Sequence, residues 1–390
     1  MEASPSRISV MGWIAPIAAM AVLSIAISTS HPLFALLLER SGASGSAIGI
    51  NHAISALAMV IAALVLPAIL GRTGLMPLML WSIVIIALCM AVIPVSGNYW
   101  WYALLRIGLG FAITAMFFAS EFWMISVVPD AIRGRVVGIY AVILSGSYMV
   151  GPKLVNFFGI DGPEIYIAIT AVVLAGALPV LLGHGHAPST KAEEARPPLA
   201  LLRFFRTDPM VMWGVILFGV IEFGAMGLIA VWGVRSGLDQ VSAVDLVFWL
   251  AFGSMVFQLP VGWAADRMDR RRLLALCGVV AVAAPLLVIA WSDSFSWIAA
   301  TIFVWGGVAV GLYTIALTEL GARYQGTALA DANAAVVLGY GLGALFAPVL
   351  LGAAMDVIPP DGVLWAAMLA AVAYCTLAVV RLAGARRKTP

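Results

Sequence analysis

The stretch GWAADRMDRRR, residues 262–272, separates two long apolar runs of the sequence, residues 243–265 and 273–291. A helix needs about 20 apolar residues to cross the hydrocarbon core of a bilayer, and each run is close to that length. The charged residues are confined to the turn between the runs, where water can solvate them. The stretch therefore predicts two transmembrane helices joined by a short basic loop.

The composition of the whole chain extends this pattern. Of its 390 residues, 63% are hydrophobic and 10% are charged, and the mean hydropathy is +1.06. These values exclude a set of soluble domains and predict an all-α membrane protein. Twelve transmembrane helices are expected, over residues 12–37, 47–70, 76–95, 99–122, 135–158, 164–183, 210–233, 243–265, 273–291, 296–320, 328–353 and 363–383.

The charges and the cysteines exclude several classes of function. The 21 Lys and Arg residues are scattered and nearly balanced by 19 Asp and Glu residues, so we expect no nucleic-acid partner. Cys89, Cys277 and Cys375 lie singly in apolar runs without metal-ligand spacing. The sequence has no Gly-x-x-x-x-Gly-Lys-Ser/Thr loop for ATP. We expect no metal and no cofactor.

The distribution of basic residues predicts the orientation. If both termini lie in the cytoplasm, seventeen of the 21 Lys and Arg residues fall on the cytoplasmic side, where such residues are retained. The first run, 12–37, is too long for a cleavable signal peptide and is expected to stay in the protein. We therefore expect a multi-pass protein of the inner membrane with both ends in the cytoplasm.

The two halves of the sequence share a pattern. An offset of 195 residues lays residues 40–42 on residues 235–237, both Arg-Ser-Gly, and lays Arg72 on Arg267. Shared turn residues at one offset favour two pseudo-symmetric six-helix bundles over a chance likeness of apolar helices. The expected domains are a first bundle at 1–183, a cytoplasmic linker at 184–209 and a second bundle at 210–390.

The opening stretch also carries a family resemblance. Its pattern Gly-x-x-x-Asp-Arg-x-x-Arg-Arg resembles the inner-loop signature of the major facilitator superfamily, although the first-half loop has Gly71 in place of the acid. RIGLGFA (106–112) looks like the superfamily's helix-four element, and GSYMVGP (146–152) is similar to an element of its proton-coupled exporters. EFW (121–123) and RGR (133–135) resemble a smaller branch of exporters and sugar-transporter-like proteins.

The resemblance implies a conformational latch at the inner ends of the helices. Gly262 would allow close helix approach, Asp266 would face the N-terminus of another helix and Arg267 would pair with an acid. The alternative is that the arginines of this loop only follow the inside-positive rule, an interpretation we prefer for Arg270, Arg271 and Arg272. The expected latch and inner-gate residues are Gly262, Asp266, Arg267, Arg72, Glu121, Arg133, Arg135, Glu319 and Arg323.

Four residues place polar or charged groups inside or near the predicted spans. A charge in the middle of a membrane costs about 2.5–3.5 kcal/mol on insertion scales, so Glu222 is expected to couple protons or contact substrate. The alternative is a permanently protonated hydrogen-bond donor. Arg106 either handles protons or substrate or extends outward to water, and Lys153 either extends outward or attracts an anionic substrate. His31, beside Pro32, marks a kink or a polar binding spot.

The resemblance also implies a central cavity lined by the first, fourth, seventh and tenth helices. Aromatic walls would suit a largely apolar or ring-bearing substrate, whereas the alternative for each residue is helix packing. The expected cavity residues are Ser28, His31, Phe34, Phe117, Trp232, Trp305, Tyr313 and Lys153.

We therefore expect a monomeric secondary transporter that moves a small organic solute by alternating access, as proton-coupled export. One alternative is proton-coupled uptake of an organic anion or a sugar-like nutrient. A membrane enzyme would need a catalytic set that the sequence lacks, so we expect no enzyme activity. A sensor that does not transport is a further alternative.

Overall fold

The computed structural model describes residues 10–188, 201–291 and 293–386, which are helical and contain no strand. The linker expected at 184–209 and the C-terminal end lie partly outside these residues. The elements are α1 (Val10–Arg40), α2 (Gly45–Thr73), α3 (Leu75–Ala91), η1 (Ile93–Val95), α4 (Tyr99–Val127), α5 (Asp130–Tyr148), α6 (Val150–Phe158), α7 (Glu164–Ala175), α8 (Ala177–Leu182), η2 (His184–His186), α10 (Phe204–Thr207), α11 (Pro209–Gly219), η3 (Val220–Ala225), α12 (Met226–Arg235), α13 (Gln240–Arg267), α14 (Arg270–Ala290), α15 (Phe295–Arg323), α16 (Gly326–Val357) and α17 (Gly362–Arg386).

Eleven helical segments of the described residues are long and apolar enough to cross a membrane. The remaining expected span, 135–158, is present as two helices, because α5 ends at Tyr148 and α6 begins at Val150. Pro152 explains this break, since its ring lacks an N–H and clashes with the carbonyl four residues earlier. This span is therefore interrupted, whereas the sequence analysis expected one continuous helix.

The chain divides into two compact units. The first part of α1 belongs to unit 1, whereas its second part, from His31, belongs to unit 2 together with the first part of α2, up to Ala56. The units therefore differ from the bundles expected at 1–183 and 210–390, and the six-helix repeat stays a prediction. Unit 1 holds Met1–Ser30, Leu57–Leu154 and Phe158–Ala195; unit 2 holds His31–Ala56, Val155–Phe157 and Arg196–Pro390.

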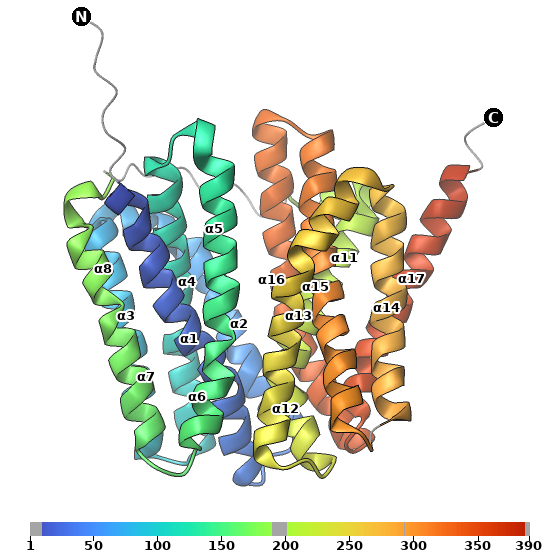
Figure 1. Ribbon diagram of the computed structural model, residues 1–390, viewed down its shortest axis with the longest axis horizontal. Helices are drawn as coiled ribbons and strands as arrows, with labels where there is room; N and C mark the ends of the chain where they lie inside the picture. The colour runs from blue at the N-terminus through green and yellow to red at the C-terminus, as the bar shows by residue number, and fades with distance from the viewer. Residues whose placement is uncertain (1–9, 189–200, 292, 387–390) are drawn as a thin grey trace, which may run out of the picture. The chain divides into compact units, whose positions relative to one another are not determined.

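In unit 1, α3 packs against α4 and α7 (Figure 1). Met79, Ile83 and Ile86 lie on the face of α3 that packs against its neighbours, whereas the opposite face is equally apolar but exposed, as at Trp81 and Leu88. Asn98 begins α4, where its side chain accepts a hydrogen bond from the N–H of Trp100 at 2.8 Å. This packing holds the buried residues of α4 in place.

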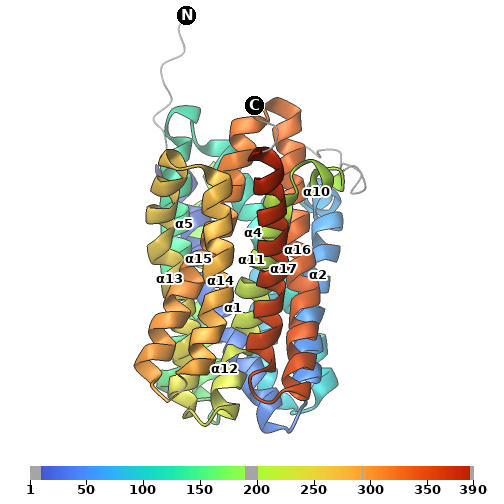
Figure 2. The ribbon, with the colours of Figure 1, turned by 90° about the vertical axis from the view of Figure 1, so that its right-hand side faces the viewer.

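In unit 2, α13 and α15 lie side by side, and α14 packs against α15 and α17 (Figure 2). Small residues allow the first contact: a Cβ at Gly253 would meet the carbonyl of Phe303. Asp239 caps α13 by accepting from the N–H groups of Val241 and Ser242, at 2.9 and 3.1 Å. The Ser242 hydroxyl and N–H lower the pKa of the Asp239 carboxyl, because both donate to its ionised form.

Candidate functional site

Glu222 lies on a π-helical turn in the middle of a membrane span. The turn, η3, joins α11 to α12 inside unit 2. The Tyr340 hydroxyl of α16 donates a hydrogen bond to Oε2 of Glu222 at 2.7 Å. A π-turn interrupts the regular ladder of an α-helix and is frequent at functional sites. The structure therefore gives Glu222 a hydrogen-bond donor from another helix.

Tyr340, which binds this carboxyl, belongs to a row of packed aromatic rings. Phe218 packs between Tyr340 and Tyr313, with ring centroids 5.4 and 5.1 Å apart. All three rings and Glu222 are half-buried, whereas Leu217 is fully buried. We call these four half-buried residues, Glu222, Tyr340, Phe218 and Tyr313, the Glu222 site. It combines one carboxyl, two phenols and an apolar ring, which suits binding of a proton and of a ring-bearing solute.

Glu222 and Tyr313 were predicted from the sequence, whereas Tyr340 and Phe218 were not. Tyr340 lies in a Gly-rich apolar segment, GYGLG at 339–343. A tyrosine in such a segment needs a hydrogen-bond partner for its hydroxyl, which was an available signal. Phe218 gave no such signal, because it resembles the other apolar residues of its helix.

Two histidines pack against the same π-turn from α1 and α2. His31 and His52 are 5% and 1% exposed, and their ring centroids are 4.9 Å apart. Nε2 of His52 lies 3.2 Å from the carbonyl oxygen of Phe223, so this nitrogen carries the proton and donates. His52 was missed by the sequence analysis, although a histidine in the apolar run 47–70 is itself a signal.

A second group of charges joins α1, α2, α12 and α16 in unit 2. Arg235 donates to both carboxylate oxygens of Glu39, at 2.9 and 2.8 Å, and lies 3.8 Å from Asp356. Asp356 accepts from the N–H groups of Gly45 and Ser46, at 2.5 and 2.8 Å, at the positive N-terminus of α2. We call Glu39, Arg235 and Asp356 the Arg235 cluster. Its hydrogen bonds and ion pairs connect the ends of α1, α2, α12 and α16.

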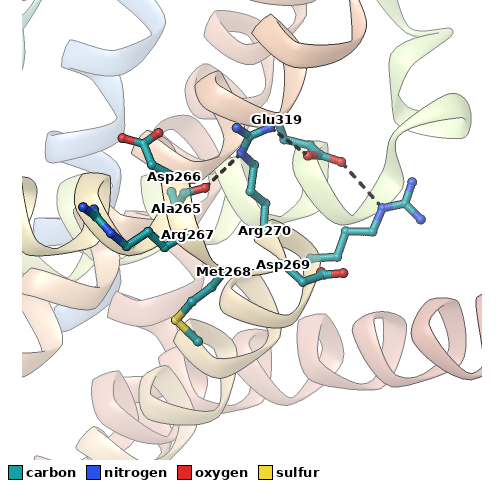
Figure 3. A pocket seen from close by; sticks show the side chains of 8 residues that line it. Ala265, Asp266, Arg267, Met268, Asp269, Arg270 and Glu319 are labelled. Atoms are coloured by element: carbon teal, nitrogen blue, oxygen red, sulfur yellow. Dashed lines mark hydrogen bonds and ion pairs between the residues drawn. The ribbon is translucent and has the colours of Figure 1, made fainter.

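A cavity of about 320 Å³ lies at the turn between α13 and α14 (Figure 3). Glu319 of α15 lies 2.7 Å from Arg323, 3.6 Å from Arg271 and 3.8 Å from Arg270. Arg270 also donates to the carbonyl of Ala265 at 3.1 Å. Arg270 and Arg271, expected only to follow the inside-positive rule, therefore hold a carboxylate across the turn. The role of Glu319 and Arg323 in an inner gate stays a prediction.

Two expected latch residues at this turn, Asp266 and Arg267, are exposed. Arg267 lies over the ring of Trp263, 4.2 Å from its centroid. Asp266 is exposed, and no hydrogen bond or ion pair joins it to the described residues. A Cβ at Gly262 would meet no described atom within 4 Å in this conformation, so the close helix approach expected there stays a prediction. Arg72 is exposed at the end of α2, and its role stays a prediction.

The other predicted residues of unit 1 are distributed over several helices. Arg106 is 3% exposed, and Ser28 is buried and donates to the carbonyl of Ile25 at 3.1 Å. Phe117 is half-buried, and Lys153 and Glu121 are exposed. The side chains of Arg133 and Arg135 lie outside the described residues.

Three predicted cavity residues of unit 2 are fully buried. Phe34, Trp232 and Trp305 are at most 1% exposed. Nε1 of Trp232 donates to Asp361 at 2.9 Å, just before α17. In this conformation these three residues pack helices together, so contact with a substrate stays a prediction for them.

Asp208 is a buried acid that the sequence analysis missed. It is 4% exposed and accepts hydrogen bonds from Arg323, from the Tyr324 hydroxyl at 2.6 Å and from the Thr207 hydroxyl at 3.0 Å. The bond to Asp208 raises the pKa of the Tyr324 hydroxyl, because the phenol donates to a carboxylate. Asp208 thus joins the start of α11 to the end of α15.

Replacing Asp208 with Asn is expected to destabilise the protein by about 1.5–3 kcal/mol, the usual contribution of hydrogen bonds to a charged group. The variant removes one of the two carboxylates that pair with Arg323 and leaves only Glu319 as its anionic partner among the described residues. Thermal unfolding of the purified protein in detergent measures the effect. Asp331→Asn is the control, because its partner Arg203 is largely exposed and such pairs contribute about 1 kcal/mol or less. Equal loss in both variants would contradict the structural role of Asp208.

Comparison with known proteins decides the family. The chain matches a family model described as Major Facilitator Superfamily over residues 16–255 and 239–390. The chain belongs to the Major Facilitator Superfamily. This membership makes it a multi-pass membrane transporter of a small molecule, and it confirms the resemblance carried by the 262–272 stretch.

Similar superfamily members include the MFS-type transporter YfkF of Bacillus subtilis, which is 22% identical over 328 residues, 82% of this chain and 83% of that protein. The MFS-type transporter YcaD of Escherichia fergusonii is 24% identical over 219 residues, 55% of each chain. Both proteins are named as uncharacterised, so their names indicate no substrate.

Solved structures of the superfamily share the fold. The nucleoside transporter NupG is 12% identical with a TM-score of 0.74, covering 97% of this chain and 98% of that chain. A D-xylose–proton symporter is 13% identical with a TM-score of 0.71, covering 94% and 96%. A bacterial homologue of the lysosomal transporter Spinster is 13% identical with a TM-score of 0.72, covering 96% of each chain. At these identities the likeness shows the all-α membrane fold alone.

Proposed function

We propose that this superfamily member is a monomeric, proton-coupled transporter that exports a ring-bearing organic solute across the inner membrane, with both termini in the cytoplasm. The Glu222 site carries the proposal. A carboxyl in the middle of a span is expensive to keep charged, and Tyr340 supplies a donor that favours its ionised form. Glu222 can therefore hold a proton in one conformation and release it in another.

The surrounding rings support a link between proton and solute. Tyr340 binds the carboxyl and packs on Phe218, which packs on Tyr313, so a row of aromatic rings with two hydroxyl groups begins at Glu222. A ring-bearing solute that packs on these faces and brings a hydrogen-bond donor or a positive charge to Glu222 would favour the ionised form of the carboxyl. Solute and proton would then compete for Glu222, as export in exchange for protons requires.

Alternating access requires ionic contacts that hold in one conformation and break in the other. In this conformation the Arg235 cluster is complete, whereas Asp266 is exposed. Asn156 of α6 adds a further hydrogen bond between helices, because it donates to Asp245 of α13 at 2.6 Å. With the predicted orientation, the Arg235 cluster lies on the outer side. We infer that it is the outer gate and that Asp266 engages when this gate opens.

The exporter-like element at 146–152 supports export as the direction. A Cβ at Gly151 would meet Ser28 and the N–H of Thr29, so α6 and α1 touch at this glycine within unit 1. This close packing explains why the element has a glycine at position 151, because a larger side chain would not fit between the helices. In this chain the element therefore makes a close contact between two helices.

Replacing Gly151 with Ala is expected to destabilise the protein by about 1–3 kcal/mol, because the added methyl group overpacks the contact with α1. Gly146→Ala is the matched control in the same predicted span, where a Cβ would meet nothing within 4 Å. Alanine favours a helix over glycine, so this control should be neutral or slightly stabilising. Thermal unfolding compares the two, and equal stability would contradict the close packing.

Arg106 favours a second candidate function. It is buried in unit 1 and cannot lose its proton, so it could contribute a positive charge to the binding of an organic anion. Proton-coupled uptake of such an anion is the alternative. The similar fold of a D-xylose–proton symporter is compatible with this direction.

Reconstitution tests both candidates. The purified protein is placed in vesicles that enclose a pH-sensitive dye, and a panel of aromatic amines, aromatic acids and sugars is added. Export predicts that aromatic solutes drive protons in the direction opposite to the solute, whereas uptake by symport predicts the same direction. Absence of solute-linked proton movement for the whole panel would contradict proton coupling.

A further inference from the structure

The π-turn that carries Glu222 is in contact with a side chain from a distant helix. His52 lies 171 residues before Phe223 and donates to its carbonyl. The His52 and Phe223 rings also pack, with centroids 4.3 Å apart. Glu222 is the residue next to Phe223, so His52 contacts the turn immediately beside the carboxyl. A π-turn is rare and persists where surrounding contacts favour it.

The same nitrogen of His52 also lies close to α12. A Cβ at Gly227 would lie 2.6 Å from Nε2 of His52, so glycine is required where α2 meets α12. His31 packs at the edge of the same ring, 4.9 Å between centroids. His52 is therefore confined by contacts with Phe223, Gly227 and His31, and its Nε2–H has a defined direction.

We propose that His52 is the positioning residue for Glu222: its hydrogen bond to the Phe223 carbonyl holds the π-turn and thereby keeps the Glu222 carboxyl directed at Tyr340. This inference rests on the proposed proton-carrying role of Glu222. Conversion of a π-turn to a regular α-helix shifts the register by one residue, which rotates side chains by about 100° at 3.6 residues per turn. Such a rotation would move Glu222 away from Tyr340.

The same contact links Glu222 to the Arg235 cluster. His52 lies in the part of α2 that belongs to unit 2, and Asp356 caps the start of this helix. When the cluster opens and α2 withdraws, the hydrogen bond to Phe223 breaks and the turn is released. His52 thus transmits the movement of α2 to the orientation of the proton-carrying group.

The test uses two His52 variants of nearly equal size. Gln retains a side-chain N–H donor, whereas Met lacks one. Dicyclohexylcarbodiimide, an apolar reagent that modifies protonated carboxyls in membranes, probes Glu222, and mass spectrometry of the labelled peptide gives the rate over a range of pH. Glu222→Gln defines the background. Each His52 variant is also combined with Tyr340→Phe, and the labelling rates form a double-mutant cycle.

In the wild-type background, Tyr340→Phe should change the labelling rate by about fivefold or more, which corresponds to a coupling energy of about 1 kcal/mol. In His52→Met the same change should have no further effect, because Glu222 no longer meets Tyr340. His52→Gln should restore the effect and the wild-type pH profile. Gly227→Ala, whose added methyl group would clash with Nε2 of His52, should behave like His52→Met.

A Tyr340 effect of equal size in wild type and in His52→Met would overturn the proposal, and so would a His52→Gln that behaves like His52→Met. His184→Met, on the exposed η2, is the control and should leave labelling unchanged. If the Met variant fails to fold, Gly227→Ala carries the same comparison. Labelling does not require transport, so these outcomes are independent of whether Glu222→Gln stops proton movement.

Discussion

Glu222→Gln is expected to reduce solute-linked proton movement by about 100-fold or more, the lower end of the effect of removing a positioned proton-transfer group. The amide keeps the size of the carboxyl and can still accept a hydrogen bond from Tyr340, but it cannot carry a proton. Folding should therefore be retained while coupling is lost. Dye-loaded vesicles measure the rate, and thermal unfolding confirms the fold.

Two further variants distinguish the effect of the Glu222 carboxyl on proton movement from the effects of its hydrogen-bond donor and of a charge elsewhere. Tyr340→Phe removes the donor at 2.7 Å but keeps the carboxyl, so proton movement should fall less than in Glu222→Gln and shift to higher pH. Glu164→Gln, at the exposed start of α7, is the charge-matched control and should behave like the wild type. Proton movement that persists in Glu222→Gln would remove Glu222 from the mechanism.

Arg235→Met is expected to open the outer gate. The variant removes the two hydrogen bonds to Glu39 and leaves Glu39 and Asp356 without the positive charge that balances them. Loss of charge-assisted hydrogen bonds costs about 1.5–3 kcal/mol, and about 2 kcal/mol shifts a two-state equilibrium by about 30-fold. The population with α2 withdrawn from α12 and α16 should increase by about this factor.

Labelling of a cysteine introduced at Ala53 measures this opening. Ala53 lies on α2 within unit 2 and is 6% exposed, so a membrane-impermeant maleimide should react slowly with Ala53→Cys in the wild-type background. Arg235→Met should accelerate the reaction by about 30-fold. Arg203→Met is the matched control, because its pair with Asp331 is exposed and contributes about 1 kcal/mol or less. Unchanged labelling in Arg235→Met would remove the cluster as a gate.

The sequence predicted the helices and the family well, because both depend on local features. Apolar runs near the bilayer thickness identified the spans, and the 262–272 stretch carried the superfamily signature. The break at Pro152 is also a local effect, although the prediction joined both sides into one span. Within the site, Glu222 was identified because a charge in an apolar run is unusual by itself.

The partners of these residues could not be predicted, because they come from distant parts of the chain. Tyr340 is 118 residues from Glu222, and Gly45 is 311 residues from Asp356. Trp232 and Trp305 resembled cavity residues in the sequence, yet the structure buries them. Arg270 and Arg271 resembled surface charges, yet they contact Glu319.

By itself, the sequence determined that the chain is helical and spans a membrane, since a bilayer requires each backbone N–H and C=O to be satisfied within its own helix. That requirement acts residue by residue and needs no knowledge of neighbours. The tertiary structure alone decided that Glu222 meets Tyr340, that His52 meets the π-turn and that Arg235 joins Glu39 to Asp356. These contacts depend on which helix faces pack together, and packing is set by the shapes of side chains that are far apart in sequence.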